Sequence, residues 1–78
     1  MIVIQLKSIA EVKNFCNLAS ELYGDVDVKS EKYIVNGKSI MGLFSLDLTK
    51  PLEVTVHEVI PSEKEQFESQ LRNYKYTI

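Results

Sequence analysis

The chain contains one cysteine, one histidine, three glycines, two prolines and no tryptophan among its 78 residues. A lone Cys16 cannot form an internal disulfide and has no second thiolate beside it, so a disulfide scaffold and a cysteine-based zinc site are both excluded. The low glycine and proline content, without repeats or low-complexity stretches, is typical of a folded globular domain. We therefore expect one domain over residues 1–78, in a reducing compartment.

Long hydrophobic runs and an excess of one charge are also missing. Apolar runs such as Ile2–Ile4 are too short to cross a bilayer, and no signal-peptide pattern opens the sequence. Nine basic and eleven acidic residues give a net charge of −2. They are scattered along the chain, which argues against a general nucleic-acid binder. We expect a cytoplasmic protein that binds neither membranes nor nucleic acid, needs no cofactor and has no catalytic constellation of its own.

The first half of the chain changes its hydrophobic period twice. Alternation over residues 2–7 predicts a half-buried strand, and helical spacing from residue 9 to residue 23 predicts an amphipathic helix. Ser8 and Glu11 form a capping-box pattern at its start, and Gly24 is placed to stop it. Alternating β-prone residues then predict two strands at 25–29 and 33–35, joined as a hairpin.

The next segment allows two interpretations. Asn36-Gly37 is a typical hairpin turn, whereas Ser39 is a good N-cap with apolar residues following it at positions 40, 43 and 44. The pattern slightly favours a short helix. After the break at Thr49-Lys50-Pro51, alternation over 52–57 predicts the last strand.

The last element predicted is a helix with a capping box at Ser62 and Glu65 and an apolar stripe formed by Phe67, Leu71 and Tyr74. The element order is thus βαββαβα. The helices must cover one face of the sheet, which leaves the other face to solvent and gives an α+β fold.

Particular residues then identify a family resemblance. Residues 36–46 and 52–56 resemble the second half of HPr, the histidine-containing phosphocarrier protein of the sugar phosphotransferase system, and Lys38-Ser39-Ile40-Met41-Gly42 is the most family-specific run. The similarity extends without a gap back through Phe15 and forward to the closing helix. It implies an HPr-like open-faced β-sandwich: a four-stranded antiparallel sheet in the order 1-4-2-3, covered on one face by three helices.

The same resemblance implies a loss of chemistry. It places Ser8 where the family has its phosphocarrier histidine and Ala10 where it has an arginine. An imidazole forms a labile phosphoramidate near neutral pH, and a guanidinium stabilises the added charge. A serine phosphate is too stable an ester to act as a relay. We therefore interpret Ser8 as a structural N-cap and assign no catalytic residue.

Ser39 aligns with the serine that an ATP-dependent kinase phosphorylates in HPr of many bacteria. A phosphate there adds roughly −1.5 to −2 charge at a helix start, where it is tolerated. The resemblance to a catabolite-repression HPr-like protein implies a regulatory module switched at Ser39, with an HPr serine kinase and a transcriptional repressor as protein partners. The alternative is that Ser39 is only an N-cap.

Apolar residues beside Ser39 form the predicted docking surface. Leu43 and Leu46 can supply the core contacts of the short helix, so the resemblance leaves Ile40, Met41 and Phe44 as an exposed patch, with Lys13 and Asn17 at its rim. The alternative is that a small domain simply buries these apolar side chains.

For the remaining candidate residues the sequence indicates a structural role or leaves the role undecided. Cys16 falls on an apolar helical stripe and is expected in the core. His57 has no partner at metal-ligand spacing, so we expect a solvated histidine and no metal site. The Tyr74–Ile78 tail is left undecided between packing on the sheet and extending an interface, and the protein is expected to be a monomer or weak homodimer.

Two other functions stay open. One is a phosphocarrier that uses an unconventional acceptor, either His57 or Ser8. The other is an unmodified structural or decoy paralogue of HPr, whose binding to partners would be unaffected by Ser39→Asp.

Overall fold

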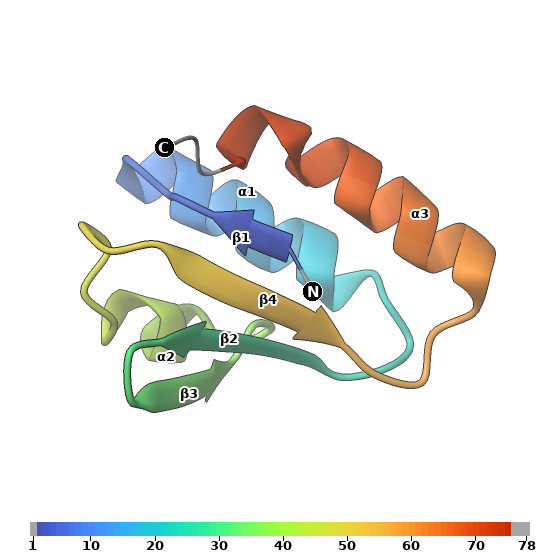
Figure 1. The fold of residues 1–78 in the computed structure, drawn as a ribbon, viewed down its shortest axis with the longest axis horizontal. Helices are drawn as coiled ribbons and strands as arrows, with labels where there is room; N and C mark the ends of the chain where they lie inside the picture. Colours follow the sequence, from blue (N-terminus) through green and yellow to red (C-terminus); the bar gives the residue numbers. More distant parts are fainter. Residues whose placement is uncertain (1, 76–78) are drawn as a thin grey trace.

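A computed structural model of the protein describes residues 2–75. These residues form four strands, three α-helices and a short 3₁₀ helix (Figure 1). The order βαββαβα predicted from hydrophobic periodicity is confirmed. None of the helices in this described range has the length and hydrophobicity needed to span a membrane. In chain order the elements are β1 (Ile2–Ile4), α1 (Ile9–Ser20), β2 (Val26–Ser30), β3 (Tyr33–Asn36), α2 (Ile40–Phe44), β4 (Leu52–Val56), α3 (Pro61–Gln70) and the 3₁₀ helix η1 (Leu71–Tyr74).

The four strands form one antiparallel sheet in the order β1-β4-β2-β3, as the resemblance implied. β4 is an inner strand: Val54 pairs with Ile2 of β1 on one side and with Val28 of β2 on the other. β2 and β3 form the predicted hairpin, closed by the pair Ser30 and Tyr33. The sheet therefore pairs the N-terminal strand with a strand about fifty positions later in the chain.

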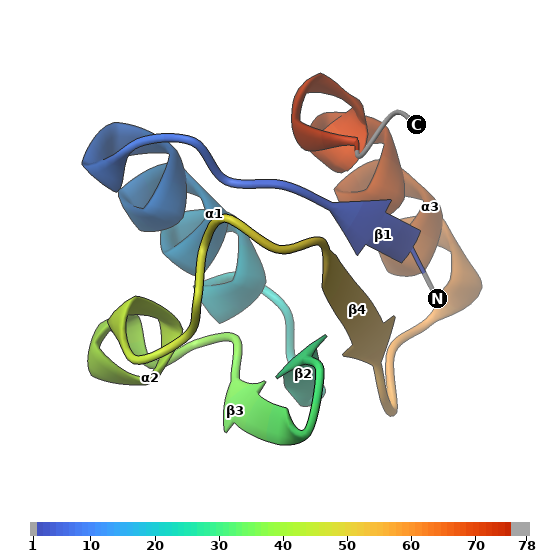
Figure 2. The same cartoon turned by 60° about the vertical axis from the view of Figure 1, so that its left-hand side comes forward.

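One face of the sheet carries the core. Alternate residues of β2 and β4 are buried, while Asp27, Lys29 and Glu53 between them are half-buried or exposed. Figure 2 shows α1 and α2 next to each other, with α3 at the side of the molecule where β1 lies. Each helix places apolar side chains in the one buried cluster, so the opposite face of the sheet is left to solvent.

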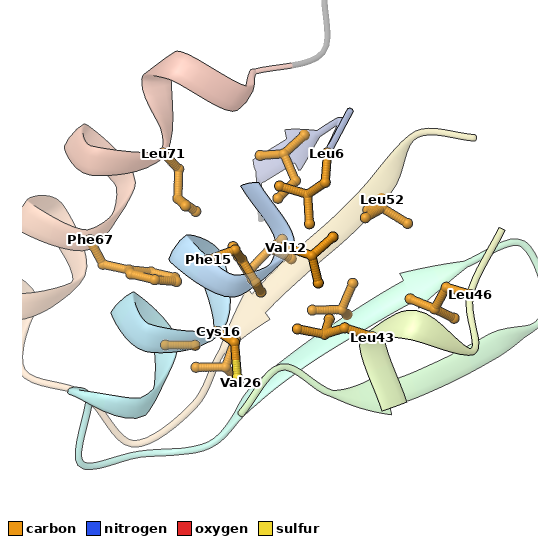
Figure 3. Close-up of a cluster of buried hydrophobic side chains, with 14 of the residues drawn as sticks. Leu6, Val12, Phe15, Cys16, Val26, Leu43, Leu46, Leu52, Phe67 and Leu71 are labelled. Carbon is orange, nitrogen blue, oxygen red and sulfur yellow. The ribbon is translucent and has the colours of Figure 1, made fainter. Parts of the chain in front are cut away.

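The core is centred on the helix α1 (Figure 3). Phe15 is fully buried, and its ring centroid lies 6.1 Å from that of Phe67 on α3, with the planes tilted by 49°. Cys16 is buried on the same stripe, as predicted for a core residue. The Phe15–Phe67 contact fastens α1 to α3 across the face of the sheet.

The helix α1 ends earlier than predicted. It stops at Ser20, whose hydroxyl donates to the Cys16 carbonyl at 2.8 Å, and Tyr23 is largely exposed instead of continuing the apolar stripe. Serine hydroxyls that bond back to the preceding turn compete with helix continuation. The prediction that Gly24 stops the helix is therefore wrong.

Gly24 is required for a different reason. Its φ is not positive, so left-handed backbone freedom is not what it provides. A Cβ atom added at Gly24 would lie 1.7 Å from the His57 carbonyl oxygen. Glycine at this position lets the turn after α1 pack directly against the chain leaving β4.

The strand β1 is also shorter than predicted. β1 ends at Ile4, which pairs with Leu52; the next position opposite is Pro51, which has no N–H for the ladder. The Gln5 N–H donates instead to the Tyr74 carbonyl at 2.7 Å.

At the start of α3, the predicted Ser62 capping box is wrong. Ile60 is the N-cap residue and Pro61 occupies the first turn, with no side-chain cap bond. Proline fits there because its missing N–H would have no helical partner. Within the tail left undecided from sequence, Tyr74 is half-buried against the core and Lys75 forms a bridge with Ile4; residues 76–78 lie outside the described range.

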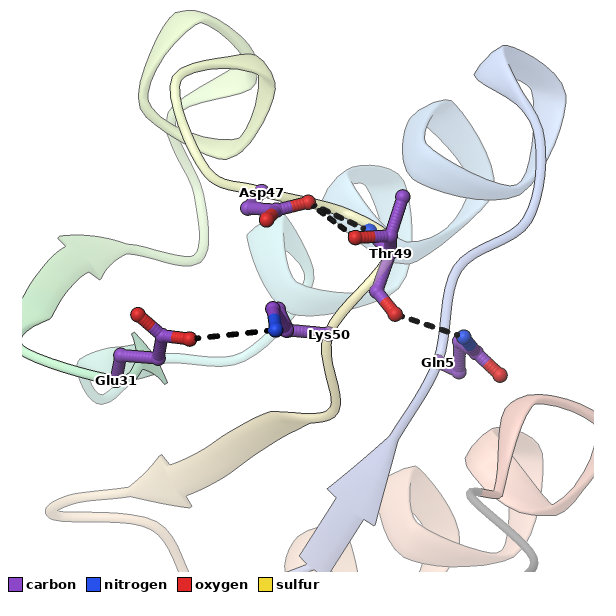
Figure 4. A network of polar contacts seen from close by, with 5 residues as sticks. All are labelled: Gln5, Glu31, Asp47, Thr49 and Lys50. Carbon is purple, nitrogen blue, oxygen red and sulfur yellow. Dashed lines mark hydrogen bonds and ion pairs between the residues drawn. The ribbon is translucent and has the colours of Figure 1, made fainter.

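A polar network holds the loop that leads into β4 (Figure 4). Asp47 Oδ1 accepts from the Thr49 N–H at 3.0 Å and from the Thr49 hydroxyl at 2.5 Å. The Thr49 carbonyl accepts from Gln5 Nε2 at 3.4 Å, which ties the loop to the chain following β1. Lys50 and Glu31 form an exposed pair at 3.8 Å, and a pair so exposed adds little stability.

We expect the Asp47 network to make the loop sensitive to acid. The two hydrogen bonds from Thr49 hold the pKa of Asp47 below its ordinary value. A carboxylate whose pKa is depressed by folding adds stability at higher pH, and that stability is lost as pH falls through the folded-state pKa. In NMR titrations Thr49→Val should raise the Asp47 pKa toward its ordinary value, whereas Lys50→Met should change it less. An unchanged Asp47 pKa in Thr49→Val would contradict this assignment.

Candidate functional site around Ser39

Ser39 begins the helix α2 as an N-cap. Its backbone is extended, with φ −102° and ψ 111°, and its hydroxyl oxygen accepts from the Gly42 N–H at 3.1 Å. The Ser39 N–H donates to the Asn36 carbonyl at 3.0 Å. The short helix favoured from the sequence is confirmed, and the alternative of a hairpin turn at Asn36-Gly37 is wrong.

The chain just before Ser39 is held against both β2 and α1. The Gly37 N–H donates to the Val26 carbonyl at 2.7 Å, and a Cβ at Gly37 would lie 2.7 Å from a Val26 methyl carbon. Lys38 extends its ammonium to the Leu22 carbonyl at 2.6 Å, and its own carbonyl lies 3.5 Å from the Cys16 thiol. Ser39 therefore stands at the end of a well-anchored segment.

The predicted docking patch is partly exposed. Met41 is 78% exposed and Phe44 is 41% exposed, whereas Ile40 is half-buried and packs against the core. Leu43 and Leu46 are buried, as expected for the residues that attach α2 to the core. The alternative that the domain buries the whole patch does not hold for Met41 and Phe44.

The rim residues lie on the neighbouring helix. Lys13 and Asn17 are exposed on α1, which contacts α2. Ile9, four residues before Lys13 on the same face, is 65% exposed and was not among the predicted patch residues. Its position could have been recognised, because Ile9, Lys13 and Asn17 share one helix face that the buried stripe does not include.

Ser8 forms the N-cap of α1, as predicted. Its hydroxyl oxygen accepts from the Glu11 N–H at 3.1 Å, and the Glu11 carboxylate accepts from the Lys7 N–H at 2.8 Å. Ala10 is exposed beside it and offers no charge. The groove next to Ser8 contains one ammonium group and is otherwise uncharged; it is lined by Gln5, Leu6, Lys7, Ser8, Ile9, Leu48 and Thr49.

His57 lies just after β4. Its Nε2 is 2.9 Å from Asp27 Oδ2, and both side chains are about half exposed, at 48% and 47%. The backbone N–H of His57 donates to the Asp25 carbonyl at 2.8 Å, and the next residue is Glu58. Among residues 2–75 no three His, Cys, Asp or Glu side chains converge to form a possible metal site.

Solved structures share the fold at low sequence identity. HPr-C-His from Thermoanaerobacter tengcongensis is 19% identical, with a TM-score of 0.76 over 92% of this chain and 90% of that one. Crh of Bacillus subtilis, a catabolite repression protein whose crystal structure is described as a domain-swapped intertwined dimer, is 19% identical, with a TM-score of 0.67 over 95% of this chain and 88% of that one.

Sequence comparisons complete the assignment. No curated protein sequence gives a significant match. A family model described as "PTS HPr component phosphorylation site" matches residues 10–71, which is most of the chain. The fold, the sheet order and this match agree, and the chain belongs to the HPr family.

Proposed function

We propose that this protein is a regulatory, HPr-like protein-binding module, switched by phosphorylation of Ser39 and without phosphocarrier activity. The observation that carries the proposal is the position of Ser39: its half-buried side chain lies two residues before Met41, the most exposed apolar residue of α2. A phosphate on Ser39 would add charge directly beside the patch formed by Ile40, Met41 and Phe44. It would thereby change which partner the patch binds.

The docking surface has the composition of a protein interface. A methionine and an aromatic side chain are exposed on α2, and the adjoining face of α1 contributes Lys13 and Asn17 at the rim. Interfaces are enriched in methionine and aromatic residues at their centre, with polar residues around them. A transcriptional repressor is the partner that the resemblance to catabolite-repression HPr-like proteins supports.

A phosphocarrier role for His57 is the less favoured alternative. The Asp27 carboxylate contacts the imidazole, and Glu58 follows His57 in the chain. The Asp27 carboxylate would repel a phosphoryl group added to the imidazole, since like charges at short range destabilise each other. Ser8 has the Glu11 carboxylate close to its backbone, and its phosphate would be too stable to pass on.

The deciding experiment is intact-mass spectrometry after incubation with ATP and an HPr serine kinase. The kinase moves the γ-phosphoryl group of ATP to Ser39 Oγ: the P–O bond to ADP breaks, the Oγ–P bond forms, and the hydroxyl proton passes to a base on the kinase. We expect one acid-stable phosphate on the wild-type protein and none on Ser39→Ala. Ser45→Ala, at the other end of α2, is the matched control and should still be phosphorylated.

A parallel sample with enzyme I and phosphoenolpyruvate tests the alternatives. An acid-labile phosphate in that sample would contradict the loss of phosphocarrier activity. Absence of phosphate in both samples would favour the unmodified paralogue, as would partner binding that is unchanged by Ser39→Asp.

A further inference from the structure

We propose that Lys38 is a positioning residue for Ser39, because its side chain ties the start of α2 to the turn that directly follows α1. The inference rests on the proposed phosphorylation of Ser39 and adds to it the residue that orients the acceptor hydroxyl. For Lys38 to orient Ser39, its side chain, its backbone N–H and its backbone carbonyl must each be held in place.

The side-chain anchor is a charge-assisted hydrogen bond. The Lys38 Nζ donates to the Leu22 carbonyl at 2.6 Å, in a partly buried setting. Leu22 itself is buried in the turn that follows α1, and its backbone N–H donates to the Ala19 carbonyl at 3.1 Å. A short bond from an ammonium to a carbonyl is stronger than a neutral one, especially where water has limited access.

Electrostatics favour this particular contact. The C-terminal end of a helix carries partial negative charge, and cations there are stabilising. The last turn of α1 contains no basic residue. Lys38, sixteen positions beyond Leu22 in the sequence, brings the missing cation from another element.

The backbone of Lys38 is anchored as well. Its N–H donates to the Asn36 side-chain oxygen at 2.9 Å, and its carbonyl lies 3.5 Å from the Cys16 thiol. The following N–H, that of Ser39, donates to the Asn36 carbonyl at 3.0 Å. These bonds hold the peptide groups before and after Lys38. The Ser39 hydroxyl oxygen then accepts from the Gly42 N–H, 3.1 Å away.

Orientation of the acceptor affects phosphoryl transfer directly. The attacking Oγ must lie in line with the bond that breaks between the γ-phosphorus and ADP, while its proton leaves to the base on the kinase. Small misplacements of a reacting atom reduce rates strongly even when binding is intact. Loss of the Lys38 anchor should therefore affect turnover more than docking.

The test compares Lys38→Met, Lys38→Arg and a control at an exposed lysine of α3, Lys64→Met. Methionine keeps the aliphatic stem and removes the ammonium, whereas arginine can still donate to the Leu22 carbonyl. Each variant is first checked for folding by circular dichroism. Two readouts follow: exchange of the Gly42 amide by NMR, which needs no kinase, and the kcat and KM for phosphorylation by an HPr serine kinase.

For Lys38→Met we expect Gly42 exchange to accelerate about fivefold and kcat to fall about tenfold, with KM changed by less than about twofold. Lys38→Arg should recover most of both effects. If Lys38→Met matches Lys64→Met in both readouts while wild type is phosphorylated, the positioning role is overturned and the Ser39 switch stands. If no variant takes up phosphate but Lys38→Met still speeds Gly42 exchange, the switch fails and the anchor is supported.

Discussion

Phe15→Ala should destabilise the protein by about 3–5 kcal/mol, the range for removing a large buried aromatic side chain. Phe15 is fully buried on α1 and contacts the ring of Phe67, so the substitution leaves a cavity between the two longest helices. A chain of this length has a total stability of only about 4–12 kcal/mol, so the loss is a large part of the whole. Urea denaturation followed by circular dichroism measures it.

The matched control for Phe15→Ala is Tyr23→Ala. Tyr23 is 88% exposed, so its removal should change the free energy of unfolding by less than about 0.5 kcal/mol. A loss of less than about 1 kcal/mol in Phe15→Ala would mean that the contact between α1 and α3 is not the centre of the core.

Gly24→Ala is expected to cost about 3 kcal/mol or more, although the change adds only one methyl group. The new Cβ would lie 1.7 Å from the His57 carbonyl oxygen and 2.9 Å from the Glu58 carbonyl carbon. These are backbone atoms, so relief requires a shift of the whole turn. We expect a lower urea midpoint, together with amide chemical-shift changes at His57 and Glu58.

Gly42→Ala provides the comparison for Gly24→Ala. A Cβ at Gly42 meets its nearest neighbour, the Ser39 hydroxyl oxygen, at 3.3 Å. Replacing glycine inside a helix by alanine also gains roughly 0.5–1 kcal/mol. The net change should stay within about 1 kcal/mol. Equal tolerance at both positions would contradict the close approach at Gly24.

Hydrophobic periodicity predicted the elements well where local patterns determine them. The order of strands and helices, the Ser8 and Ser39 caps and the burial of Phe15 and Leu43 all follow from residues a few positions apart. The sheet order came from the family resemblance and could not be obtained from periodicity, because pairing between β1 and β4 involves residues about fifty positions apart in the chain.

The errors came from residues whose role is set by distant neighbours. Gly24 has the position of a helix stop, but its purpose is contact with the chain after β4. Ser62 and Glu65 have capping-box spacing, but Pro61 already begins the helix one residue earlier. The same limit applies to the candidate site: sequence spacing predicted Ser39 and the apolar residues beside it, whereas the contact from Lys38 to Leu22 depends on how α1 and α2 pack.

The inner position of β4 also bears on how the protein is made. Among residues 2–75, β4 is the only strand that pairs with β1, whose other backbone pairing is the single bridge from Ile4 to Lys75, and β4 joins β1 to the β2–β3 hairpin. During synthesis the hairpin is therefore the one pair of these strands that can form before residue 52 has been added. Until then β1 has no strand beside it, and the buried face of α1 lacks the core residues that β4 and α3 supply, Leu52, Val54 and Phe67. Folding of this small domain thus depends on nonlocal closure, which is slow relative to helix formation. A growing chain would keep its apolar surfaces open until most of its length had emerged.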